Sequence, residues 1–265
     1  MASSELLVLI LAGIAACARW HIWAREASRV ARLAAVPALR RSLLLAPLAC
    51  LAVLVAVLVL FASFDVRVDL FYIFYYAVMG AAWVGLAMSL VPYLGVSARD
   101  DVIERGNRAA LWPVLGALLG LTLCFAGGNI GDGPGWWVVV FCGLLSTGAL
   151  FGLWWLLEVT VAPSEAVTVD RDPASGVRLG AFLLAIGLVL GRAVAGDWHS
   201  FDATIRDFFV AGWPAGAIAL LAIGFEWAFA PTAETPSRSA LAGLPPALVY
   251  LGTAVAWVSH LGDFR

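Results

Sequence analysis

Two glutamates, Glu158 and Glu226, are the acidic residues that lie deepest in the apolar segments of this sequence. A carboxylate near membrane hydrocarbon is costly, and such residues often line the path of an ion, a proton or a solute. We expect both glutamates within about one helical turn of a membrane interface, where water or a nearby arginine would also stabilise them. They are candidates for a solute path, and structural pairing is the alternative.

Arginines at the starts of four apolar segments form the second candidate group. The free N–H groups of a helix N-terminus attract anions, and a guanidinium group binds phosphate through two hydrogen bonds. This pattern predicts contacts with anionic lipid head groups, or with a phosphorylated solute, at Arg41, Arg108, Arg178 and Arg238. The alternative is the ordinary excess of arginine on the cytoplasmic side of a membrane protein.

Two further polar segments offer little chemistry. Segment 197–207 mixes His199 with several aspartates, but its spacing matches no metal or catalytic signature, so we interpret it as a solvated loop. The glycine-rich segment 127–135 lacks the Lys-Ser/Thr ending of a phosphate-binding loop and is interpreted as a tight turn. We therefore expect no catalytic residues, no metal, no cofactor and no enzymatic activity.

The composition identifies the elements that must position these residues. Of the 265 residues, 63% are hydrophobic and 13% are charged, against about 45–50% and about 25% in soluble domains. The excess apolar surface has to face lipid. The net charge of −2 excludes the basic surface of a nucleic-acid-binding protein. The sequence predicts an all-α polytopic transmembrane bundle.

Eight apolar segments are long enough to span a membrane, because a spanning helix needs about 20 mostly apolar residues. They are Glu5–Trp23, Ser42–Ser63, Phe71–Leu94, Ala109–Gly127, Trp136–Leu157, Gly176–Gly196, Phe208–Ala230 and Leu241–Leu261. The last contains Pro245 and Pro246, which shorten its regular part. Seven spans followed by a re-entrant or interfacial tail is the alternative.

Arginine placement predicts the orientation. Twelve of the sixteen arginines fall in or beside the connections that follow the first, third, fifth and seventh segments. By the positive-inside rule these connections are cytoplasmic, and both termini are then outside the cytoplasm. We expect a multi-pass protein of the bacterial inner membrane, with both termini in the periplasm.

The segments recur as helical hairpins, at about residues 5–63, 71–127, 136–196 and 208–261, within a single transmembrane domain. At a spacing of about 66 residues, Pro47, Pro113 and Pro245 fall in register, and Leu179 is the exception. Internal repeats are common in membrane transporters. The alternative is that hairpins with loops of similar length produce the same rhythm without duplication.

Small residues and helix caps accompany the repeat. Close packing of helices is expected at Gly116, Gly120, Gly180 and Gly187, either within the bundle or between protomers. Asn107 and Asp172 are expected to cap the N-termini of the fourth and sixth helices, with Ser42 and Ser239 in similar places.

Two short stretches carry a family resemblance. Glu104-Arg-Gly-Asn107-Arg-Ala-Ala-Leu111 and Asp170-Arg-Asp172-Pro-Ala-Ser-Gly176 each precede a glycine-spaced apolar helix. This pattern resembles the YjfL family of bacterial inner-membrane proteins, which carries a duplicated two-helix domain, and it covers about residues 71–196. The second stretch departs from the pattern, with Asp172-Pro173 in place of Asn. The resemblance implies location and architecture but no activity.

The functional prediction is a non-enzymatic transport or channel-like component of the membrane. The alternative is a packing or scaffold subunit of an oligomeric assembly that binds anionic lipid at its cytoplasmic face. We expect membrane lipids as partners, together with further copies of the chain or another membrane protein, and no nucleic acid.

Overall fold

The computed structural model describes residues 3–29, 37–232 and 239–262. Eight helices in this part of the chain are long and apolar enough to cross a membrane. They are α1 (Ser3–Arg29), α2 (Pro37–Phe61), α4 (Leu70–Ala87), α5 (Arg108–Gly127), α6 (Trp136–Val161), α8 (Pro173–Ala193), α9 (Phe201–Phe229) and α10 (Leu244–His260), which continues from the short helix η4 (Ala240–Gly243). The predicted all-α polytopic bundle is confirmed, and the last of the eight helices is also long and apolar enough to cross a membrane.

Short helices fill several of the connections. They are α3 (Phe64–Val68), η2 (Val91–Leu94), η3 (Ala98–Glu104) and α7 (Pro163–Thr168). The third span is shorter than the sequence predicts, because α4 ends at Ala87 and the chain turns through the 3-10 helix η2, which contains Pro92. The seventh begins earlier, at Phe201, where the Ser200 hydroxyl accepts a hydrogen bond from the Ala203 amide (3.2 Å).

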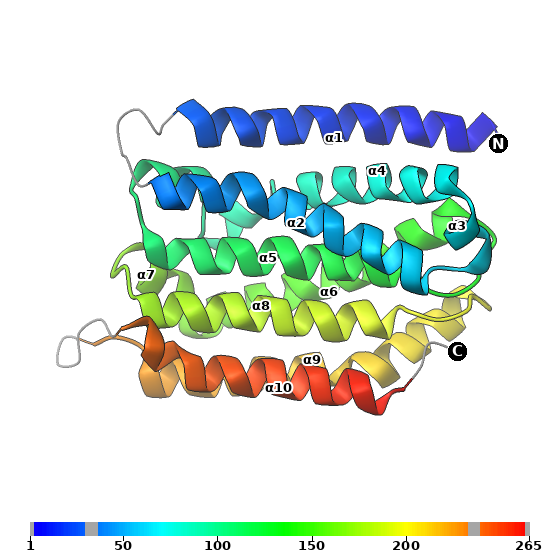
Figure 1. The fold of residues 1–265 in the computed structure, drawn as a ribbon. Helices are drawn as coiled ribbons and strands as arrows, with labels where there is room; N and C mark the ends of the chain where they lie inside the picture. Colours follow the sequence, from blue (N-terminus) through cyan, green and yellow to red (C-terminus); the bar gives the residue numbers. More distant parts are fainter. Residues whose placement is uncertain (1–2, 30–36, 233–238, 263–265) are drawn as a thin grey trace.

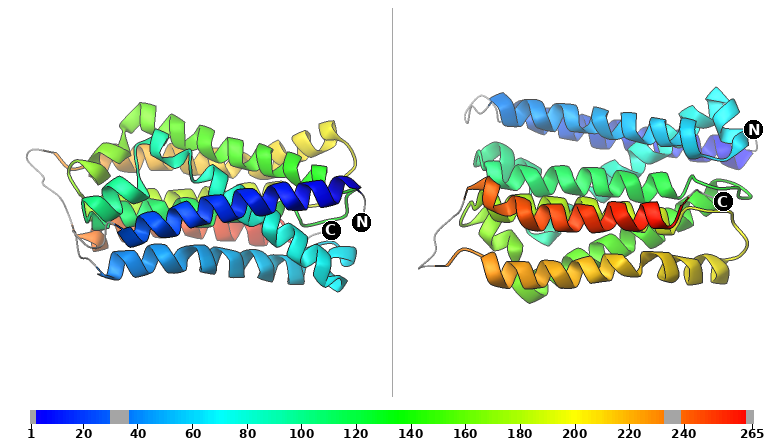
Figure 2. Two further views of the ribbon diagram at one scale, coloured as in Figure 1. Left: turned by 90° about the horizontal axis from the view of Figure 1, so that it is seen from above. Right: turned by 60° about the horizontal axis from the view of Figure 1, so that its bottom comes forward.

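The helices lie side by side along one direction, with α5 and α8 next to each other in the centre (Figures 1 and 2). Helix α1 lies at one edge of the bundle and packs on α4, whereas α10 lies at the other edge and packs on α8 and α9. From one edge of the bundle to the other, the hairpins thus follow one another in the order of the chain. The two central helices are buried along most of their length, and the outer helices are open to lipid.

Glycines allow α5 and α8 to approach closely. A Cβ atom at Gly116 would fall on the carbonyl oxygen of Gly180, and one at Gly180 would lie 2.5 Å from the carbonyl oxygen of Trp112. A Cβ atom at Gly187 would fall on the backbone of Gly120. The residue numbers of the two contacting positions differ by 64 to 68 in all three contacts. Because this difference hardly changes along the helices, α5 and α8 run in the same direction. We call this contact the glycine seam.

Side-chain caps begin the two central helices as the sequence predicts. Asn107 accepts a hydrogen bond from the backbone N–H two residues later (2.9 Å), and Asp172 from the one three residues later (2.8 Å). The expectation for Ser42 is wrong, because α2 begins at Pro37 and Ser42 lies inside it. Ser239 precedes η4 without a capping hydrogen bond from its side chain.

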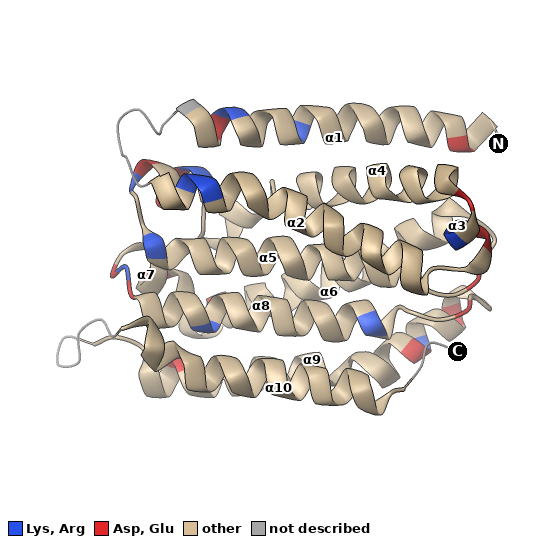
Figure 3. Ribbon diagram, in the orientation of Figure 1, with Lys and Arg blue, Asp and Glu red and all other residues tan. Residues whose placement is uncertain are grey.

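Charge divides the two ends of the bundle (Figure 3). Most of the described arginines lie at the end where α1 finishes and α2, α5, α8 and α10 begin, which we call the arginine-rich end. The described chain starts and finishes at the other end, the terminal end (Figure 1). An even number of spans requires this arrangement.

Candidate functional site

A polar cavity of about 270 Å³ lies at the terminal end. Two connections form part of its wall, the glycine-rich segment between α5 and α6 and the segment between α8 and α9, together with the first turns of α1, α3 and α4. Five carboxylates line it, at Glu5, Asp65, Asp132, Asp197 and Asp207. No arginine or lysine is among its described lining residues. We call it the acidic cavity.

Two Gly-Asp turns hold one wall of the acidic cavity. The Asp132 amide donates to the Asp197 carboxylate (2.8 Å), and the Trp198 amide donates to the Asp132 carbonyl oxygen (2.8 Å). Gly131 and Gly196 both adopt positive φ angles (99° and 145°), and a Cβ atom at Gly131 would fall on the Gly196 backbone. These glycines let the two loops pair closely, so the two aspartates lie side by side.

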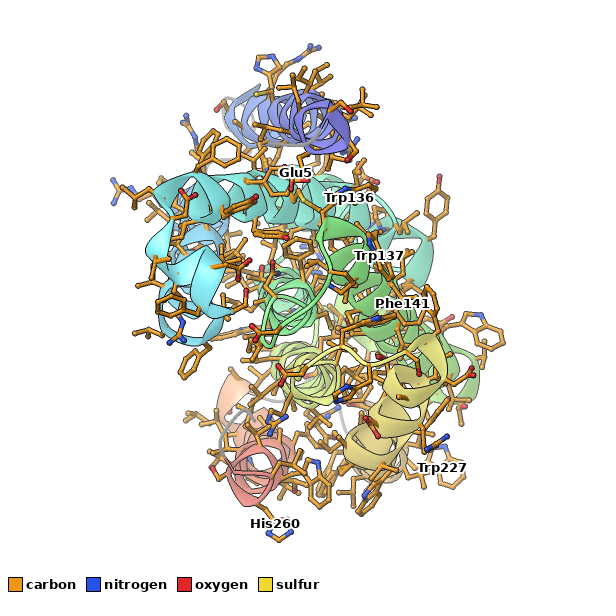
Figure 4. All side chains as sticks on the ribbon, turned by 90° about the vertical axis from the view of Figure 1, so that its right-hand side faces the viewer. Glu5, Trp136, Trp137, Phe141, Trp227 and His260 are labelled. Carbon is orange, nitrogen blue, oxygen red and sulfur yellow. The ribbon has the colours of Figure 1, made fainter. Side chains whose placement is uncertain are left out.

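The opposite wall comes from the N-terminal part of the chain. Glu5 lies on the side of α1 that faces the rest of the bundle (Figure 4), and its carboxylate is 3.5 Å from the Tyr72 hydroxyl. The Ser63 hydroxyl donates to Asp65 (2.5 Å) at the start of α3. The cavity therefore joins residues of the first hairpin to loops that follow α5 and α8.

The lining of the acidic cavity is rich in hydrogen-bond acceptors. Among the described residues, no three His, Cys, Asp or Glu side chains are grouped closely enough to hold a metal. Asn129 also lines the cavity. Its amide nitrogen donates to the Phe125 carbonyl oxygen (2.8 Å), and its buried amide oxygen has no hydrogen-bond partner. A ligand with several N–H donors would match such a lining.

A buried ion pair lies at the arginine-rich end, between α8 and α9. Arg178 donates through Nε and Nη2 to the two carboxylate oxygens of Glu226, at 2.7 and 2.6 Å. The side chains are 1% and 4% exposed. Two parallel bonds of this kind fix both side chains, and burial makes the loss of either partner costly.

The ion pair belongs to a longer hydrogen-bonded chain. Arg178 Nη2 also donates to the Ser175 hydroxyl (2.8 Å), and that hydroxyl donates to Asp172 (2.7 Å), the capping residue of α8. Arg178 Nη1 and the Tyr250 hydroxyl are buried without a hydrogen-bond partner. The network ties α9 to the first turn of α8, and through it to the cap of that helix.

Glu158 is half-buried near the end of α6 and is held locally. Its carboxylate accepts hydrogen bonds from the Ser164 hydroxyl (2.7 Å), the Ser164 amide (3.3 Å) and the Trp154 indole (3.0 Å). Both glutamates singled out in the sequence therefore lie at the arginine-rich end with specific partners. Pairing with a nearby arginine was part of the alternative interpretation, and Glu226 has such a partner in Arg178. The printed partners of Glu158 are Ser164 and Trp154 instead.

The four candidate lipid-binding arginines have different surroundings. Arg41 and Arg108 are exposed at the arginine-rich end. Arg178 is buried and bound to Glu226, so its guanidinium cannot reach a lipid head group, a fact that its position in the sequence does not reveal. Arg238 lies outside the described residues.

Three buried polar side chains lie midway along the helices. The Thr122 hydroxyl donates to the Leu118 carbonyl oxygen (2.7 Å) and the Ser146 hydroxyl to that of Cys142 (2.9 Å). Thr147 accepts a hydrogen bond from the Trp83 indole (3.0 Å). Thr122 and Ser146 are thus bonded within their own helices, whereas Thr147 is bonded to a side chain of α4.

The acidic cavity was not predicted from the sequence, although segment 197–207 and its aspartates were noted. One signal could have located it. Gly131-Asp132 and Gly196-Asp197 are the same dipeptide 65 residues apart, which is the spacing of the repeat. Equivalent positions in adjacent parallel hairpins lie close together, so the two aspartates were a candidate pair.

Comparisons with known proteins add no assignment. The chain matches no family model, no curated protein sequence and no solved structure. The resemblance to the YjfL family therefore stays a prediction.

Proposed function

We propose that this multi-pass membrane protein is a transport component for a small organic cation, which it binds in the acidic cavity. The observation that carries the proposal is the lining of five carboxylates with no basic side chain among the described residues. Such a lining raises the local concentration of cations and lowers that of anions. A polyamine or another multiply protonated amine has the matching charge and hydrogen-bond donors.

In this proposal the route of the cation is closed at the arginine-rich end of the bundle. Glu158 and Glu226 lie there, but their carboxylates are occupied by Ser164, Trp154 and Arg178. Passage of a solute would require the Arg178–Glu226 pair to separate and α9 to move away from α8. In this proposal the described conformation is open toward the terminal end and closed at the arginine-rich end.

The glycine seam is relevant to the alternative function, a scaffold subunit of an oligomer. The four glycines that favoured an assembly role lie in the seam between α5 and α8 of one chain. They are therefore used for packing within the chain. A homo-oligomer, a second membrane protein as partner and anionic lipid at Arg41 and Arg108 remain proposals without a contact that favours them. Four further predictions also remain proposals. They are a bacterial inner-membrane location, a periplasmic position of both termini, duplication of the hairpins and membership of the YjfL-like family.

Binding of radiolabelled spermidine to the protein in nanodiscs tests the cation site. The double variant Asp132→Asn/Asp207→Asn removes two exposed carboxylates of the cavity. Each partly solvated charge contributes roughly 0.5–1 kcal/mol, so we expect the dissociation constant to rise about tenfold. Salt should weaken binding to the wild type more than binding to this variant.

The matched control is Glu165→Gln/Asp170→Asn, which removes two exposed carboxylates at the arginine-rich end. It should bind spermidine like the wild type. Equal losses in both double variants, or no binding of spermidine, would contradict the cation site. Uptake of spermidine into proteoliposomes then tests transport: binding without uptake under any imposed gradient would contradict the transport role and leave the binding site standing.

A further inference from the structure

An apolar groove of about 260 Å³ lies between α1 and α2, near the arginine-rich half of the bundle. Its floor is formed by α4, with Thr122 of α5. The lining residues are Trp20, Trp23, Ala24, Leu44, Pro47 and Leu48, followed by Cys50, Leu51, Leu54, Gly80, Ala81 and Val84. Both flanking helices are membrane spans, so the groove faces the hydrocarbon of the bilayer.

A second cavity of about 360 Å³ adjoins this groove toward the arginine-rich end. Trp20 and Trp23 line both of them, so these two indoles mark the boundary between an apolar and a polar compartment. Their orientation is fixed, because Trp20 Nε1 donates to the Ala81 carbonyl oxygen (2.9 Å) and Trp23 Nε1 to that of Leu43 (2.8 Å). Tryptophan is favoured at such polar–apolar boundaries in membranes.

Charged side chains of both signs line the second cavity, namely Arg19, Arg99, Glu26 and Asp100. Arg19 Nε donates to the Gly85 carbonyl oxygen (3.2 Å), which holds the guanidinium at the wall. Arg99 is 55% exposed, lies 3.9 Å from Glu26 and donates through Nε to Glu104 (3.0 Å), which is not among the lining residues. The lining therefore offers two positive and two negative groups in one place, close to the end of the apolar groove.

We propose that these adjoining cavities bind one phospholipid with a zwitterionic amine head group, of the phosphatidylethanolamine type. An acyl chain occupies the groove between α1 and α2. The phosphate lies near Arg19 and Arg99, and the ammonium group lies near Glu26 and Asp100. An apolar compartment joined to a polar one matches an amphipathic ligand, and the balanced charges match a head group that carries both signs. This site is independent of the acidic cavity and of the proposed transport role.

Filling the groove tests the acyl chain. Ala24 is exposed on α1 and lines the groove, whereas Ala18 is exposed on the same helix and is not part of this lining. We expect Ala24→Phe to reduce the fraction of protein that retains phosphatidylethanolamine at least fivefold in native mass spectrometry after purification. Ala18→Phe, the matched control, should retain it as the wild type does. Equal retention in both variants, or no lipid on the wild type, would overturn the proposal.

The choice of lipid tests the head group. The protein is exchanged into mixed nanodiscs of phosphatidylethanolamine and phosphatidylglycerol, and the bound lipid is identified after ejection. We expect phosphatidylethanolamine on the wild type and its loss, by about fivefold, in Arg99→Gln. Arg105→Gln is the control, because Arg105 is 57% exposed, forms an ion pair with Asp101 (2.9 Å) and does not line the cavity. Preferential retention of phosphatidylglycerol, or equal effects of the two substitutions, would overturn the assignment.

Discussion

At the scale of single residues, the Arg178–Glu226 pair stands out among the ion pairs of the described residues, because both of its side chains are buried. Burial removes the hydration of both charges, and two parallel hydrogen bonds replace it. A pair of this kind contributes little compared with an apolar pair of the same shape, but removal of one partner leaves an uncompensated buried charge. The pair therefore fixes how α9 docks on α8.

Glu226→Gln is expected to lower the free energy of unfolding by about 3 kcal/mol, because Arg178 then stays buried without the carboxylate to which it is directly bonded. Thermal unfolding of the detergent-purified protein measures the change. The double variant Arg178→Met/Glu226→Leu should recover most of the loss. Glu104→Gln is the control, because it breaks the exposed Arg99–Glu104 pair and should leave the unfolding midpoint near that of the wild type. A midpoint for Glu226→Gln equal to that of this control would contradict the structural role.

At the scale of elements, the glycine seam makes α5 and α8 one central unit. Backbone atoms of the two helices approach more closely than any side chain would allow. Lipid offers no hydrophobic driving force between helices, so close van der Waals contact is the main source of their association. The outer helices then pack on this unit.

Gly180→Ala is expected to destabilise the protein by about 2 kcal/mol, because its methyl group would lie 2.5 Å from the Trp112 carbonyl oxygen. Gly148→Ala in α6 is the matched control. No atom lies within 4 Å of its Cβ position, so the higher helix propensity of alanine should leave stability unchanged or raised by up to about 1 kcal/mol. Measured side by side, the unfolding midpoint should fall for Gly180→Ala and should stay the same or rise for Gly148→Ala. Equal midpoints would contradict the described seam.

At the scale of the whole molecule, the two ends of the bundle differ in kind. The terminal end holds the acidic cavity, and the arginine-rich end holds the ion pair and the proposed head-group cavity. The asymmetry predicts orientation, because arginines are retained on the cytoplasmic side during insertion. The acidic cavity would then open to the periplasm.

Labelling of cysteines introduced at exposed positions, in intact cells, tests this orientation. In a Cys17→Ser background, which removes the exposed native thiol, Asp202→Cys should react with a membrane-impermeant maleimide. Asp170→Cys should react only after the membrane is permeabilised. Both positions are exposed, one at each end of the bundle. The reverse pattern would contradict the predicted orientation and would place the acidic cavity on the cytoplasmic side.

Features that depend on local composition were readable from the sequence. The eight spans and the caps at Asn107 and Asp172 follow from runs of apolar residues and from side chains that bond to their own backbone. Their ends were less readable, as the early end of α4 and the position of Ser42 inside α2 show. Glu158 is bonded to Trp154 and Ser164, which lie within six residues of it, whereas nothing near Glu226 in the sequence identifies Arg178 as its partner.

The sequence by itself determined that the chain forms membrane-spanning helices, because lipid exposure and backbone hydrogen bonding act on each segment separately. Only the tertiary structure decided which polar groups meet. Arg178 finds Glu226 across 48 residues, Asp132 meets Asp197 across 65, and the seam glycines face each other within the chain. These contacts depend on how parallel hairpins stack in space. Partner choice is therefore a property of the whole bundle and of no single segment.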